Sequence, residues 1–211
     1  RRLSGVPGVS DVAYGVPPLQ GFTSTHDVPA SSGHPAVTLA ETDVGADYFE
    51  TFGIRIRQGR GITSSDDSTS APVVVINASA ARAFFPPGAA VGQQLDAVKI
   101  GERHPTVVGV VADFPQEDVA ISATPEAFHA SAQDGGSPFT ISIRTSGDAV
   151  SLTPFVRAAV HDLDPLLALG GVTTMDKVVA SSTAPARFAS LLLGAFAALA
   201  VILAALGLYG V

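Results

Sequence analysis

The 211-residue sequence has no cysteine, no tryptophan and few basic residues. Without cysteine the chain cannot form disulfide bonds, thiolate zinc sites or thiolate-ligated iron–sulfur clusters, and it has no cysteine nucleophile. Its 12 Lys and Arg residues are outnumbered by 19 Asp and Glu residues, which gives a formal net charge of -7. Because nucleic-acid binding requires clustered cations that neutralise phosphates, we expect no nucleic-acid partner.

The usual sequence signatures of cofactor and metal sites are also lacking. The glycines of Gly59–Ile62 stop short of the Walker and dinucleotide-binding spacings. The five histidines never lie three to five residues apart, so we interpret them as scattered surface residues. Asp66 and Asp67 are adjacent and lack the spaced oxygen ligands of a calcium loop. With no G-x-S-x-G elbow either, we expect no catalytic, cofactor-binding or metal site.

A long apolar run stands at the C-terminal end and contributes much of the positive mean hydropathy of +0.36. Residues 188–211 include no charged residue. A helix of this length spans about 36 Å, and a bilayer hydrocarbon core is about 30 Å thick. Its large apolar side chains favour membrane insertion by about 4 to 7 kcal/mol. We therefore predict a transmembrane helix and consider a buried core helix the less favoured alternative.

The N-terminal end resembles neither a start site nor a signal peptide. The chain begins Arg1-Arg2-Leu3, its only methionine is Met175, and no apolar run follows the two arginines. We expect it to be part of a longer polypeptide that begins inside a domain and ends just after a membrane span. The residues ahead of the apolar run suffice for one domain or two small ones.

Apolar periodicity predicts an irregular alternation of strands and helices ahead of that run. We expect an exposed loop over residues 21–35, because Ser, Thr, Gly, His and Pro are frequent there. An irregular alternation is typical of an α+β domain. The predicted strands are 9–15, 36–41, 54–57, 73–76, 94–100, 106–112 and 139–144, and the predicted helices are 46–52, 78–85, 151–163 and 175–180.

Three of these elements carry more detailed expectations. The uniformly apolar residues 73–76 predict a strand that is buried on both faces. Asn77 is placed to cap the following helix. Gly53 is placed to end the helix that carries Tyr48 and Phe49, because glycine readily adopts the left-handed conformation. We expect both aromatic side chains to be core anchors.

The apolar helix should begin shortly before its membrane-spanning part. Ser182 or Thr183 can cap it, and Pro185 suits a first helical turn. Arg187 would then lie at the outer edge of the membrane. No proline occurs from Ala186 onward, so a straight helix could act as a lever between domain and membrane.

Small residues recur every four positions along this helix at Ser190, Gly194 and Ala198. Small side chains let helix backbones approach closely within a membrane. We expect this face to pack against protein, and the alternative is an alanine-rich span without a particular face.

An ordered series of short patterns resembles the extracytoplasmic core domain of MacB-like ABC-transporter permeases. It begins with DYFETFGI at 47–54, GRGI at 59–62 and PVVVIN at 72–77. The series continues through 106–111, 144–148, 163–165, 174–175 and 187–188, and residues 207–211 resemble the start of an FtsX-like permease module.

The resemblance implies a mixed, two-part α+β domain followed by one transmembrane helix. Residues 1–183 would be the extracytoplasmic domain and 184–211 the membrane helix. Within the domain, 1–58 and 138–183 would form a porter-like outer part and 59–137 a smaller inserted α/β part. The family further implies a bacterial inner-membrane efflux or mechanotransmission permease, with residues 1–183 on the periplasmic side.

The same resemblance implies partners and a non-enzymatic role. The implied partners are a cytoplasmic ATP-binding subunit or domain, the membrane, a second copy of the full permease and a periplasmic adaptor. The resemblance implies no cofactor. The alternatives are a ligand-sensing domain ahead of a membrane helix and a membrane-anchored hydrolase, for which no nucleophile constellation is present. The structural or coupling candidates are Tyr48, Phe49, Gly53, Gly59, Arg60, Pro185, Arg187 and Gly194.

Overall fold

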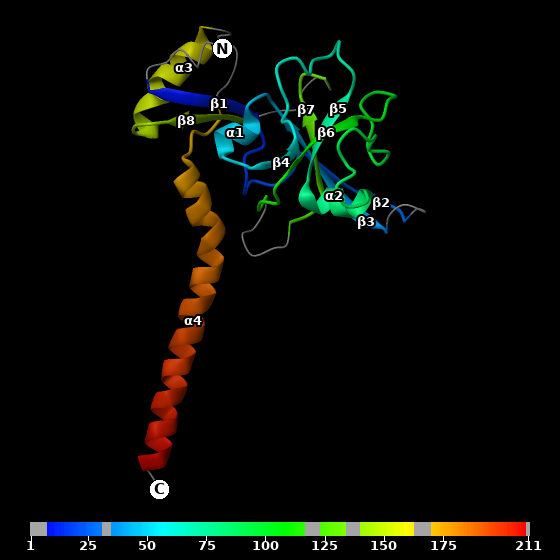
Figure 1. The fold of residues 1–211 in the computed structure, drawn as a ribbon. Coiled ribbons are helices and arrows are strands. Elements are labelled where there is room, and N and C mark those ends of the chain that lie inside the picture. The colour runs from blue at the N-terminus through cyan, green and yellow to red at the C-terminus, as the bar shows by residue number, and fades with distance from the viewer. Residues whose placement is uncertain (1–7, 31–34, 117–122, 134–139, 163–169, 210–211) are drawn as a thin grey trace. The chain divides into compact units, whose positions relative to one another are not determined.

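The computed structural model describes residues 8–30, 35–116, 123–133, 140–162 and 170–209, with backbone only at 183–188 and 207–208. It divides into two compact units, Arg1–Val172 and Thr173–Val211 (Figure 1). The first unit holds a mixed sheet with short helices, and the second holds one long helix. This architecture confirms the predicted α+β class with a C-terminal apolar helix.

The elements of the first unit follow one another without a regular repeat. They are β1 (Val9–Gly15), β2 (Ser24–Val28), β3 (Val37–Val44), α1 (Tyr48–Phe52), β4 (Ile56–Gly59), β5 (Val73–Asn77), α2 (Ala78–Phe84), β6 (Thr106–Val111), β7 (Glu126–Ala130), β8 (Thr140–Thr145), the 3-10 helix η2 (Ala149–Leu152) and α3 (Thr153–His161). The second unit is α4 (Met175–Tyr209).

The eight strands form one sheet in the order β4-β6-β5-β7-β3-β1-β8, with β2 also paired to β3. The β5–β6 and β3–β7 pairs are parallel and the others are antiparallel. Strands that are distant in the sequence are therefore neighbours, since β7 lies between β5 and β3.

Strand β3 shares one of its edges between two partners. Its first five residues pair with β2 from Val37↔Val28 to Glu41↔Ser24. Its last residue, Val44, pairs with Gly15 of β1. That is the one residue pair joining β1 to β3, whereas β1 and β8 share six.

The sheet carries a hydrophobic core on each face. One core gathers Leu39, Val74, Ile76 and Ala127 beneath α2. The other gathers Val44, Val75, Phe128 and Ala130 beneath Tyr48 and Phe49 of α1. Successive residues of β5 alternate between these cores, which is why the strand is buried throughout.

Local signals set the ends of both short helices as predicted. Asn77 Oδ1 accepts a hydrogen bond from the Ala80 amide at 2.8 Å and caps α2. Gly53 has φ 68° and ends α1 in the left-handed conformation. Arg144 of β8 also satisfies a backbone carbonyl at the end of α1, because its Nε donates to the Thr51 carbonyl at 2.8 Å.

Several predicted elements differ from the structure. The segment 21–35 contains strand β2, and the segment 114–137, which has no distinctive sequence pattern, contains β7. Residues 94–100 make only isolated bridges, at Gln94 and Ile100. The predicted strand 54–57 lies two residues later, at Ile56–Gly59. Strands with polar residues, such as β2 and β7, and bridges of a single residue pair give the sequence little apolar periodicity from which to predict them.

The long helix begins earlier than predicted. α4 starts at Met175, so the predicted helix 175–180 is its first part, and Ser182 and Pro185 lie in its interior. The Ser181 and Ser182 hydroxyls donate to the Val178 and Val179 carbonyls three residues back, as interior serines do, and neither caps a helix start.

The α3 helix is shorter than the predicted 151–163, and its apolar stripe is only partly covered. Val160 is buried, but Phe155 on the same helix is 60% exposed. Leu163 lies outside the described residues.

Candidate functional site

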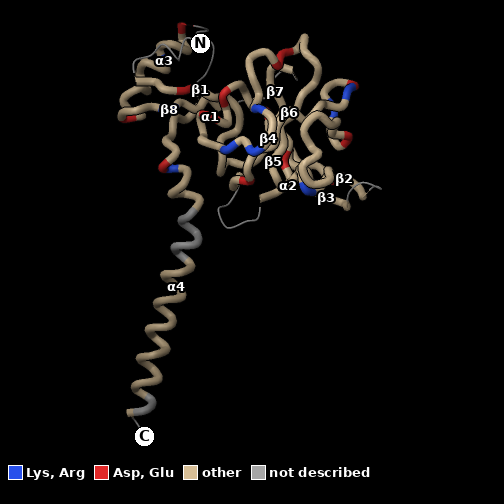
Figure 2. The backbone as a smooth tube through the Cα atoms, viewed as in Figure 1, with Lys and Arg blue, Asp and Glu red and all other residues tan. Residues whose placement is uncertain are grey.

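The described part of α4 from Ala189 to Leu206 presents apolar side chains on all sides. Among the described residues, this segment is the one that is long and apolar enough to cross a membrane. Its large side chains are exposed, from Leu191 at 74% to Leu206 at 64%. In Figure 2 the coloured charged residues of α4 lie in its first turn, and residues 189–206 include no charged residue. A surface of this kind suits lipid or other membrane helices.

The three candidate residues of α4 lie along its length. Pro185 and Arg187 are inside the helix, and their side chains lie outside the described residues. Gly194 lies in the apolar part, and a Cβ added there would meet nothing within 4 Å. The helix face around Gly194 is therefore open for close approach by another backbone.

The aromatic candidates Tyr48 and Phe49 form a cluster with Phe128 of β7. They are 0% and 2% exposed, and Phe49 meets both other rings edge to face at centroid distances of 5.2 to 5.4 Å. The Tyr48 hydroxyl donates to the Val16 carbonyl at 2.7 Å. Burial, with the nearby Glu126, raises the pKa of Tyr48 far above its usual value. These side chains are core anchors without access to a ligand.

Gly59 occupies a tight crossing between β4 and β6. Its φ is 68°, and a side chain there would collide with the Val108 carbonyl. Gly109 lies opposite, where a Cβ would collide with the Arg60 carbonyl. Glycine is required at both positions because the two backbones touch.

Arg60 fastens the loop that follows β4. Its guanidinium donates two hydrogen bonds to the Asp66 carboxylate, at 2.7 and 2.8 Å. Thr63 adds its amide and hydroxyl at 2.8 and 2.9 Å. Burial alone would raise the pKa of Asp66, but the hydrogen bonds from Arg60 and Thr63 hold it below its usual value. Gly59 and Arg60 thus have structural roles.

Two histidines meet one carboxylate beside the α2-side core, which corrects their interpretation as scattered surface residues. His26 Nδ1 lies 2.9 Å from Glu41 Oε1, and His129 Nε2 lies 2.8 Å from Glu41 Oε2. His129 is 4% exposed, and neither of its ring nitrogens makes a well-directed hydrogen bond. The contact with His129 contributes most to lowering the pKa of Glu41.

This histidine–carboxylate group does not amount to a metal centre. Within the described ranges, no set of three or more His, Asp or Glu side chains is arranged to hold a metal ion. Sequence spacing could not find the cluster, because its members come from three different strands.

A second polar group missed by sequence reasoning lies on the other face of the sheet. Glu126, the first residue of β7, is 1% exposed and accepts hydrogen bonds from Thr42 and Gln116. Burial raises its pKa to about 8. A glutamate at the start of a five-residue strand that also contains a histidine gives no sequence signal of burial.

Comparison with known proteins supports this architecture. The sequence profile described as MacB-like periplasmic core domain matches residues 2–160. A search of curated proteins returned no significant match.

Two solved structures resemble the fold. The periplasmic region of MacB from Actinobacillus actinomycetemcomitans is 20% identical, with a TM-score of 0.53 over 77% of this chain and 71% of that one. The extracellular domain of the noncanonic ABC-type transporter YknZ from Gram-positive bacteria is 17% identical, with a TM-score of 0.51 over 78% of this chain and 79% of that one.

Proposed function

The chain belongs to the MacB-like periplasmic core domain family, and we propose that it couples cytoplasmic ATP hydrolysis to movement outside the membrane. In this proposal the first unit is the extracytoplasmic domain of an ABC-type export or mechanotransmission permease. α4 would connect that domain to the membrane-embedded part.

The continuity of α4 is the observation that carries the proposal. Its 35 residues correspond to about 52 Å of helix, which exceeds a hydrocarbon core of about 30 Å. The apolar segment Ala189–Leu206 accounts for the membrane, and the turns from Met175 onward continue beyond it. A helix without an interruption can pass an axial or rotational displacement from one end to the other.

The proposal assigns binding roles rather than chemistry to the chain. The ATPase would be a cytoplasmic subunit or a further domain, and the working permease would be a homodimer that meets a periplasmic adaptor. We propose no catalytic residue, because the buried carboxyl groups of the domain are held by structural hydrogen bonds. The division of the domain into an outer part and an insertion at 59–137 remains a prediction.

The orientation of the domain can be tested with one introduced thiol. The natural sequence has no cysteine, and Ser68 is exposed. Ser68→Cys in the full permease should react with a membrane-impermeant maleimide in intact cells to the same extent as in lysed cells. The unaltered protein is the matched control for background. Labelling that requires lysis would place the domain in the cytoplasm and contradict the proposal.

The mechanical role of α4 can be tested by insertion after Ala186. Two inserted glycines cost about 2 kcal/mol of helix stability and create a hinge. Two inserted alanines shift the helix register equally but keep the helix stiff, so they are the matched control. We expect the glycine insertion to reduce transport more than the alanine insertion does, while ATPase activity persists. Equal transport by both insertions and the unaltered permease would contradict force transmission through α4.

A further inference from the structure

We propose that Glu126 is a protonation-dependent clasp that holds the segments 16–21 and 114–116 against the β3–β7 pair. The proposal goes beyond transport coupling, because it concerns how tightly the extracytoplasmic domain itself is held together.

The clasp is centred on one carboxyl oxygen. Glu126 Oε1 accepts the Thr42 hydroxyl at 2.6 Å and the Gln116 side-chain amide at 2.7 Å. Thr42 belongs to β3 and Gln116 follows β6, so the carboxyl joins chain segments 84 and 10 residues away. The Glu126 backbone is fixed as well, because its amide donates to Asn77 Oδ1 at 3.1 Å.

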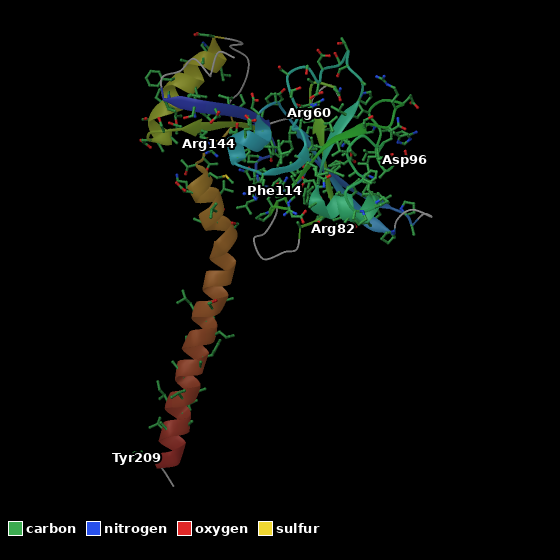
Figure 3. The ribbon with its side chains drawn as sticks, viewed as in Figure 1. Arg60, Arg82, Asp96, Phe114, Arg144 and Tyr209 are labelled. Atoms are coloured by element: carbon green, nitrogen blue, oxygen red, sulfur yellow. The ribbon has the colours of Figure 1, made fainter. Side chains whose placement is uncertain are left out.

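Two segments outside the strands meet at Gln116, which this carboxyl holds. The Gln116 carbonyl accepts the Gly21 amide at 2.8 Å, which ties the segment after β1 to the segment after β6. Phe114, labelled in Figure 3, stacks on Phe128 with centroids 5.7 Å apart. The Tyr48 hydroxyl holds the Val16 carbonyl at the start of segment 16–21. Releasing Gln116 would free the Gly21 amide and loosen the parts of both segments nearest to it, while Phe114 and Val16 keep their own contacts.

The surroundings of the carboxyl favour its neutral form. Both of its side-chain partners are uncharged donors, and no ion pair within the described residues includes Glu126. Among the residues that the structure describes, the titratable group that interacts with it is Tyr48 of α1. Glu41 and His129 lie on the opposite face of the sheet, because side chains alternate along β3 and β7. The hydrogen bonds from Thr42 and Gln116 favour the ionised form, but they do not offset the cost of burying a carboxylate without a countercharge, so the group keeps its proton.

Ionisation of Glu126 therefore opposes the folded state. Its pKa is about 8 in the folded chain and 4.5 in an ordinary environment. Between these values the folded chain holds a proton that the unfolded chain has lost, so stability falls as pH rises. The folding equilibrium constant should fall about 10-fold per pH unit within this window and level off above it. Above pH 8 the unpaired charge would draw in water, and this hydration would release Gln116, although a carboxylate is the stronger hydrogen-bond acceptor.

The test compares the 211-residue chain in detergent micelles with two variants between pH 6 and pH 8. Glu126→Gln keeps a hydrogen-bonding side chain of the same size but cannot ionise. Glu50→Gln removes an exposed carboxyl from α1 and is the matched control. From denaturant titrations we expect the folding constant of the natural chain and of Glu50→Gln to fall roughly 50-fold over this range. The folding constant of Glu126→Gln should change far less.

Local release of Gln116 is measured by hydrogen exchange at the Gly21 amide. The exchange rates are corrected for the intrinsic pH dependence of exchange. Its protection should decrease with pH in the natural chain and stay constant in Glu126→Gln. If Glu126→Gln keeps the full pH dependence, or if Gly21 protection in the natural chain does not change, the clasp is refuted. Should Glu126→Gln not fold, the carbon-13 shift of the Glu126 carboxyl in the natural chain decides, and a titration midpoint near 4.5 refutes the proposal.

Discussion

Replacing Phe49 by alanine should destabilise the extracytoplasmic unit strongly. Phe49 is 2% exposed and contacts Tyr48 and Phe128 edge to face, with centroids 5.4 and 5.2 Å away. Truncating a buried phenylalanine to alanine costs about 3 to 5 kcal/mol, because the apolar contacts are lost and a cavity remains. α1 has only five residues and cannot move inward far enough to refill that space without losing its own contacts.

The expected loss is large enough for a thermal melt. In a domain of this size each kcal/mol shifts Tm by about 2 to 4 °C, so we expect a decrease of roughly 6 to 20 °C. The measurement uses circular dichroism of the chain in detergent micelles. α4 adds helical signal there, so near-ultraviolet tyrosine absorbance, to which Tyr14 and Tyr48 of the first unit contribute beside Tyr209 of α4, gives a second probe.

Phe155→Ala is the matched control for this experiment. It removes the same side chain from α3, where the ring is 60% exposed, and surface substitutions usually change stability by less than about 0.5 kcal/mol. If Phe49→Ala lowered Tm no more than Phe155→Ala, the ring of Phe49 would not be a core anchor. An exposed and functional role would then have to be considered for it.

Three further substitutions test other contacts. Gly45→Ala should lower Tm, because a Cβ at that position would collide with the ring of Tyr14, and a Tm within 1 °C of the natural chain would contradict this packing. Asn77→Ala should cost at least about 0.5 to 2 kcal/mol in a denaturant titration, because the cap of α2 is lost together with the bonds to the Glu126 amide and the Thr124 carbonyl, and an unchanged midpoint would show that none of these contacts matters. Gly194→Leu should reduce assembly of the full permease, measured by crosslinking or size exclusion, more than Ala195→Leu does, whereas equal effects would remove the case for a packing face.

Much of the fold could be predicted where burial leaves a mark on the sequence. The run Val73–Ile76 is apolar at every position because β5 lies between two cores, and a short run of β-branched residues is typical of a strand in that position. Asn77 and Gly53 were informative because a cap requires a particular side chain or a particular φ, and both requirements act within a few residues.

The elements that were missed are those whose partners lie far away in the chain. β2 reads Ser-Thr-His-Asp-Val, and only its pairing with β3 makes it a strand. β7 is buried at all five positions, yet it contains Glu126 and His129, whose burial depends on partners 84 to 88 residues away. The predicted start of the long helix was wrong for a related reason. Ser182 and Pro185 suit a first turn locally, but they lie within a helix that begins at Met175. Propensity alone cannot detect such tertiary effects.

The pairing of β1 with its two neighbours has a mechanical consequence. A sheet resists bending through its ladders of backbone hydrogen bonds, and its stiffness along any seam grows with the number of rungs. The seam between β1 and β3 has the single pair Gly15↔Val44, supplemented by the Gly45 amide that donates to the Tyr14 carbonyl at 2.8 Å. The β1–β8 seam has six pairs. We therefore expect a load on the β1–β8 pair to bend the sheet at the β1–β3 seam, where the contacts of α1 with β1 and β8 and the Arg144–Thr51 hydrogen bond reinforce the single backbone pair, before it disturbs the β1–β8 ladder.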